Sequence, residues 1–148
     1  MAPVLQSPRC MNCHTITDFP RQGDARREHF LNVRRGPENH GMAGMRCSTC
    51  HATHNQTAAD VPGAPHWGLA PLSMGWEGKN VHALCLAVLD RSKNGNRNIA
   101  ALVHHFSDDP LVGWAWHPGG TRRPPPVDKP HFRALVAHWA ATGAECPA

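Results

Sequence analysis

Three stretches in the second half of the chain have the hydrophobic spacing of amphipathic helices. The first follows Asn80 and ends before Asn94-Gly95, and the second starts at Ile99 and ends before Asp108-Asp109-Pro110. The third begins near Asp128 as N-cap, with Pro130 in its first turn, and Gly143 is its expected C-cap. The apolar residues of these stripes recur at i, i+3, i+4 and i+7, and they are Val81, Leu84, Cys85 and Val88, then Ile99, Leu102, Val103 and Phe106, then Phe132, Leu135, Val136 and Trp139.

The rest of the chain predicts irregular structure. Residues 61–78 contain three Pro and four Gly, which exclude a long helix or a central strand, although the segment is rich in Trp, Leu and Met. We expect this apolar loop to pack against a cofactor face. Residues 9–60 predict short helical turns after each of two cysteine motifs, and residues 24–33 predict a short helix or an extended arm. No strand pair is evident.

These patterns indicate a single domain over residues 1–148, mainly α with long irregular loops. It divides into residues 9–60, which carry the cysteine motifs, and residues 61–148, the helical half expected to cover a cofactor. The composition supports this division, because aromatic residues are only 6% of the chain while it holds 12 His and 6 Cys. A chain poor in core-forming side chains and rich in metal ligands is expected to build its core around a metal or cofactor.

Two Cys-x-x-Cys-His motifs identify that cofactor. They are Cys10-Met11-Asn12-Cys13-His14 and Cys47-Ser48-Thr49-Cys50-His51. This pattern attaches c-type haem: two thiols on one helical turn reach the vinyl groups of the porphyrin, and the following His binds the iron. The sequence therefore predicts two haem c groups, held through Cys10, Cys13, Cys47 and Cys50, with His14 and His51 as proximal iron ligands.

Two other interpretations fit the motifs less well. A zinc knuckle with four thiolate ligands would need both pairs together, but 33 residues separate Cys13 from Cys47 and the histidines would be superfluous. A thioredoxin-like redox pair needs one motif in a βαβ setting.

The haem prediction also sets the compartment. Haem is attached to thiols on the periplasmic side in bacteria, so we expect a periplasmic protein whose signal peptide has been removed. Cys85 and Cys146 remain outside the motifs and predict a disulfide in that oxidising compartment, with two buried free thiols as the alternative. There is no run of about 18 apolar residues, so no transmembrane segment is expected.

The sixth iron ligand decides the function, because a strong ligand makes an electron carrier and an open position makes a reactive haem. His29, between the motifs, and His66, in the apolar loop, are the leading distal candidates. Met74 and His105 are weaker alternatives, and a core role is the commoner explanation of a Met. Most of the other histidines are expected to be bystanders.

Basic residues near the motifs could bind the propionate groups of the haems. Arg34, Arg35 and Arg46 are candidate partners for the haem propionates, with a solvated basic face as the alternative. The formal net charge of +4 is too mild, and the basic residues too sparse, for nucleic-acid binding.

The chain resembles small bacterial dihaem c-type cytochromes of the kind known as isoquinoline 1-oxidoreductase subunits. The resemblance covers nearly the whole chain and is carried by RCMNCHTITDFPRQGD, NVRRGP, MRCSTCH, VPGAPHWGLAPLSMGWEG and DPLVGWAW. It implies a multihaem cytochrome fold and a molybdenum hydroxylase as electron donor. Similarity to other short multihaem carriers favours His29 and His66 as distal ligands.

The predicted function is electron transfer between a redox enzyme and a respiratory acceptor, without catalysis by this chain. Three alternatives stay open: a haem enzyme with one five-coordinate iron acting on peroxide or a nitrogen oxide, a gas or redox sensor, and a zinc-binding interaction protein.

Overall fold

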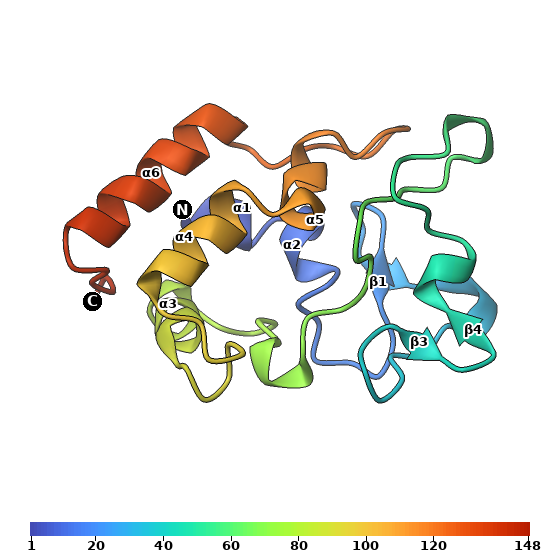
Figure 1. Ribbon diagram of the computed structural model, residues 1–148, viewed down its shortest axis with the longest axis horizontal. Helices are drawn as coiled ribbons and strands as arrows, with labels where there is room; N and C mark the ends of the chain where they lie inside the picture. Colours follow the sequence, from blue (N-terminus) through green and yellow to red (C-terminus); the bar gives the residue numbers. More distant parts are fainter.

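The computed structural model describes all 148 residues, with the long helices at one end of the molecule and two small hairpins at the other (Figure 1). The helices are α1 (Ala2–Leu5), α2 (Pro8–Met11), α3 (Val81–Leu89), α4 (Ile99–Ser107), α5 (Pro110–Gly113) and α6 (Lys129–Ala141). The strands are β1 (Arg21–Gln22), β2 (Arg27–Glu28), β3 (Gly41–Met42) and β4 (Met45–Arg46). Short 3₁₀ turns cover Phe30–Asn32, Cys47–Thr49, Thr57–Ala59, Leu72–Met74 and Trp114–Trp116.

The three predicted helices are confirmed as α3, α4 and α6, although α3 ends at Leu89, earlier than the end predicted before Asn94-Gly95. Polar side chains cap their first turns. Asn80 accepts a hydrogen bond from the backbone N–H of Ala83, at 2.8 Å. Asn98 does the same for Ala101 at 2.9 Å, and Asp128 for His131 at 2.8 Å. Each cap satisfies a backbone donor that has no partner inside the helix, which fixes where the helix begins.

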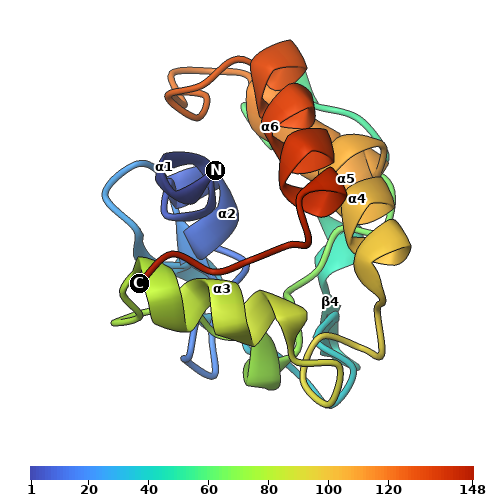
Figure 2. The same cartoon turned by 90° about the vertical axis from the view of Figure 1, so that its left-hand side faces the viewer.

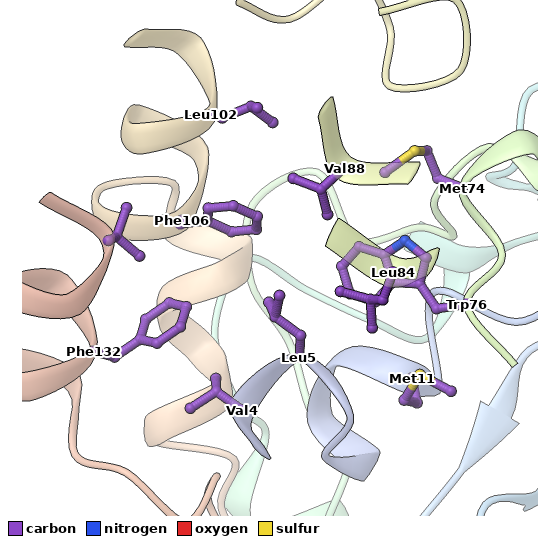
Figure 3. Close-up of a cluster of buried hydrophobic side chains, with 11 residues drawn as sticks. Val4, Leu5, Met11, Met74, Trp76, Leu84, Val88, Leu102, Phe106 and Phe132 are labelled. Carbon is purple, nitrogen blue, oxygen red and sulfur yellow. The ribbon is translucent and has the colours of Figure 1, made fainter. Parts of the chain in front are cut away.

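Helix α4 packs beside α6, while α3 lies across the molecule from α6 (Figure 2). Phe106 of α4 meets Phe132 of α6 edge-on, with ring centroids 6.2 Å apart. The core continues through the N-terminal turns, and Figure 3 shows Leu102 and Phe106 facing the side chains of Val88 and Trp76. Its buried members are Val4, Leu5, Met11, Met74, Trp76, Leu84, Val88, Leu102, Phe106, Phe132 and Val136.

A disulfide joins Cys85 of α3 to Cys146, which lies beyond α6, with Cα atoms 5.6 Å apart. The C-terminal segment returns from α6 to α3 (Figure 2), where the ring of His82 donates to the carbonyl of Pro147 at 2.6 Å. These are the two cysteines left over by the Cys-x-x-Cys-His motifs. The cross-link therefore closes the helical half of the chain on itself.

The N-terminal half corrects three expectations. Two antiparallel hairpins are present where no strand pair was expected: β1 pairs with β2 and β3 with β4. Strands of two residues are too short to show the alternation by which strands are recognised in a sequence. The segment 24–33 is neither a short helix nor an extended arm, because it contains β2 and a 3₁₀ turn. The helical turns also overlap the cysteine motifs instead of following them.

No helix has the length and apolar character needed to cross a membrane.

Candidate cofactor sites

The first motif forms one helical turn at the end of α2. The backbone N–H of His14 donates to the carbonyl of Cys10 at 3.0 Å, so both thiols lie on one side of the turn. Burial raises the pKa of the Cys10 thiol to about 12 and that of Cys13 to about 11. These thiols are therefore neutral at physiological pH, unlike the low-pKa thiolates of redox or metal-binding cysteines.

His14 is held on two sides. Its ring stacks on the indole of Trp76, with centroids 3.5 Å apart and planes 9° from parallel. Its Nδ1 lies 2.8 Å from the carbonyl oxygen of Met74. Because a carbonyl only accepts hydrogen bonds, Nδ1 must carry the proton, which leaves the Nε2 lone pair free for a metal. Burial lowers the pKa of His14 to about 3, so the imidazole is neutral, as an iron ligand must be.

The first motif opens into an apolar cavity of about 270 Å³. Cys10, Cys13 and His14 line it on one side, and residues of α4, α5 and the 66–76 loop complete the walls. Three candidate distal ligands, His66, Met74 and His105, also line this cavity. The volume is just below the usual range for ligand pockets, and the lining combines covalent attachment groups, an imidazole and apolar walls.

Two arginines missed by the sequence reasoning line the same cavity. The Arg9 side chain is 1% exposed and pairs with Asp24 at 2.7 Å, but its Nε has no hydrogen-bond partner. Arg97 donates to the carbonyl of Asn94 at 2.7 Å and keeps other donors free. A buried guanidinium and a partly buried one, both incompletely paired, fit the carboxylates of a haem, so the donor set of this cavity fits the group. Arg9 precedes Cys10 directly in the sequence, and this adjacency could have indicated that it lies beside the first motif.

The three arginines predicted as propionate partners do not line the cavity. Arg35 is buried and donates instead to the carbonyls of Thr15, Thr17 and Ala70 and to Asn39. Arg34 bonds to Asn32 and Arg46 to Glu38. The sequence shows that these arginines are near the motifs. It does not show which acceptors elsewhere in the chain already form hydrogen bonds with them.

The second motif repeats the construction of the first. Its 3₁₀ turn is closed by the N–H of His51, which donates to the carbonyl of Cys47 at 2.9 Å. Nδ1 of His51 donates to the carbonyl of Pro62 at 2.7 Å, and the ring stacks on Trp67 at 4.6 Å between centroids and 11° between planes. Burial lowers the pKa of His51. Cys50 is exposed, so this site is more open than the first.

His29 lies next to His51, with ring centroids 6.0 Å apart and planes at 72°. A spacing of this kind would leave room for both imidazoles to hold one metal ion, each at about 2 Å. Nδ1 of His29 donates to the carbonyl of Phe30 at 2.8 Å, so its Nε2 is also free. Of the distal candidates, His29 is the one that the fold brings beside the second motif.

The two sites adjoin each other. Charge on Cys47 contributes to the raised pKa of Cys13, after the larger effect of burial. Trp67 stacks on His51, lines the cavity of the first motif and meets Trp114 edge-on at 4.7 Å. No group of three or more His, Cys, Asp or Glu side chains is placed to hold a metal ion, so the four-thiolate zinc arrangement is not formed.

Comparison with known protein families, curated proteins and solved structures found no match to this chain. The resemblance to dihaem cytochromes therefore stays a prediction from the motifs.

Proposed function

We propose that this chain is a periplasmic dihaem c-type cytochrome that transfers electrons between a redox enzyme and a respiratory acceptor. The observation that carries the proposal is the repeated construction of the two motifs. In each, two cysteines share a helical turn, and the His that follows donates through Nδ1 to a carbonyl and stacks on a tryptophan. Two motifs with unrelated surroundings share a geometry that leaves Nε2 free to bind a metal.

The chain's own residues would attach each haem, bind its iron and connect the two sites for electron transfer. Cys10, Cys13, Cys47 and Cys50 offer thiols for thioether bonds, and His14 and His51 offer Nε2 to the iron. Bound haem supplies an iron that cycles between Fe(III) and Fe(II) without transfer of atoms. Trp67 lies between the two sites, which favours passage of an electron from one to the other.

Haem content is the first test. The protein is produced in a bacterial periplasm with the c-type maturation machinery, and covalent haem is counted by pyridine haemochrome and by mass under denaturing conditions. We expect two haems per chain. The double variants Cys10→Ser/Cys13→Ser and Cys47→Ser/Cys50→Ser should each retain one, while Cys85→Ser/Cys146→Ser should retain both. A colourless wild-type protein would sink the proposal.

Carbon monoxide separates a carrier from the enzyme or sensor alternatives. A reduced carrier with two filled iron sites should not bind CO, whereas His29→Ala should bind about one CO per chain because it opens one site. His54→Ala removes a nearby exposed imidazole and should leave the spectrum unchanged. CO binding by the wild type would instead favour a haem enzyme or sensor.

The partner proposal has its own test. A periplasmic redox enzyme of the molybdenum hydroxylase class is a candidate donor, as the family resemblance implies. The purified dihaem protein is mixed with such an enzyme and its substrate, and haem reduction is followed by stopped-flow absorbance. The rate of reduction should saturate as the enzyme concentration increases. Reduction at the rate of the free substrate alone would exclude that enzyme as the donor.

A further inference from the structure

The cavity of the first motif holds one candidate iron ligand that is oriented by a carboxylate. His105 lies on α4, one turn after Leu102 and next to Phe106, and all three residues line the cavity together with His14. Residues three apart share a helix face, so the buried stripe of α4 carries the imidazole inward. His105 is half-buried, as expected of a side chain that faces an internal space.

Asp109 holds the His105 ring. Its Oδ2 lies 3.1 Å from Nδ1 of His105. Its Oδ1 accepts the N–H of Leu111 at 2.8 Å, as N-cap of α5. The carboxylate is thus fixed by the start of one helix and orients an imidazole on another. A carboxylate only accepts here, so Nδ1 carries the proton and Nε2 is free. A carboxylate that accepts from Nδ1 in this way orients metal-bound histidines and increases their basicity.

The two rivals in the cavity are less well placed. The carbonyl of Met74 accepts the hydrogen bond from His14, so Met74 belongs to the wall that already supplies the proximal ligand. A sixth ligand must approach the iron from the opposite face. His66 is exposed, unlike His105, and sits at a positive φ of 60° in the apolar loop.

We propose that His105 is the sixth iron ligand of the haem at Cys10 and Cys13, and that Asp109 is its positioning residue. The proposal rests on the proposed function, since it needs haem at the first motif. It revises the ranking from the sequence, where His66 stood above His105. It also divides the four histidines into two pairs, His14 with His105 and His29 with His51.

The test uses the fully matured protein and counts covalent haem before anything else, so that failure of the proposed function is recognised separately. A wild type without haem refutes the proposed function. With two haems present, His105→Ala should bind about one CO per chain when reduced, and added imidazole should restore the six-coordinate spectrum. His66→Ala and Met74→Leu should bind none.

Asp109→Asn tests the positioning role. Asn keeps the N-cap of α5, because it caps as well as Asp, but it loses the carboxylate that increases the basicity of His105. We expect both irons to stay six-coordinate and one reduction potential to rise while the other is unchanged. Asp108→Asn, at an adjacent exposed carboxylate, is the matched control and should move neither.

The outcomes decide the matter. CO binding by the wild type at the first haem overturns the assignment. So does CO binding by His66→Ala or by Met74→Leu when His105→Ala binds none. Where His105→Ala does not mature, His105→Met serves, because a thioether ligand should raise the potential of one haem. An unchanged potential in His105→Met overturns the proposal as well.

Discussion

The role of a histidine in this protein depends on what holds its Nδ1 and on where its Nε2 lies. His14, His29, His51 and His105 all donate through Nδ1. Exposed histidines such as His82 do the same, so the hydrogen bond alone does not distinguish a ligand. Position separates the proposed ligands from such bystanders: the rings of His14 and His105 line one cavity, and those of His29 and His51 adjoin.

The buried Arg35 shows that a cation near a motif can be structural. Its guanidinium spans carbonyls from two separate segments, Thr15 at 2.9 Å and Ala70 at 2.5 Å, which tie the first motif to the apolar loop. Removal of the guanidinium leaves these buried carbonyls without a hydrogen-bond donor.

We expect Arg35→Ala to lower the free energy of unfolding by about 3 kcal/mol, because several charge-assisted hydrogen bonds are lost together. Chemical denaturation followed by circular dichroism measures the change. The neighbouring Arg34→Ala, which is more exposed, should change it by less than about 1 kcal/mol. Equal effects of the two substitutions would refute the structural role of Arg35.

At the scale of elements, the sequence predicts the helices well and the hairpins not at all. Each long helix has an amphipathic stripe and a capping side chain, which are local signals. The β3–β4 hairpin depends on Gly41, whose φ is +85° and where an added Cβ would run into the carbonyl of Met45. Such a close approach is a property of the folded chain, so a pattern of hydrophobic positions cannot show it.

The Cys85–Cys146 disulfide joins two elements that are 61 residues apart in sequence. A cross-link over this separation restricts the unfolded chain and is expected to contribute about 4 kcal/mol. The double variant Cys85→Ala/Cys146→Ala should therefore unfold at markedly lower denaturant concentration while it keeps its covalent haem. An unchanged midpoint would show that the bond contributes nothing to stability.

At the scale of the whole molecule, Glu77 joins three parts of the chain. It accepts hydrogen bonds from the N–H of Ile16, at 3.0 Å, and from Arg26, and it lies 3.6 Å from Arg21. Burial acts to raise the pKa of Glu77, but the hydrogen bond from Ile16 and the charge of Arg26 outweigh it, and the pKa is lowered from 4.5.

This lowered pKa predicts the acid sensitivity of the fold. The ionised carboxylate is favoured by folding, so its contribution is complete above the unfolded-state pKa and is lost as the pH falls through the folded one. We expect the free energy of unfolding to decrease below about pH 4.5, and to decrease less in Glu77→Gln. Glu38→Gln, at an exposed carboxylate, should keep the wild-type pH dependence. The same pH dependence in Glu77→Gln would contradict the argument.

The sequence by itself determined the long helices and predicts the haem chemistry, because caps, apolar stripes and the two Cys-x-x-Cys-His motifs all lie in neighbouring residues. It identified Cys10, Cys13 and His14, their second copy, and the pair of cysteines left over. Only the tertiary structure decided which histidines share a cavity or lie side by side, that Arg9 rather than Arg35 faces the cavity, and that Asp109 holds His105. Those relations join residues far apart in the chain, and they depend on packing that no local pattern encodes.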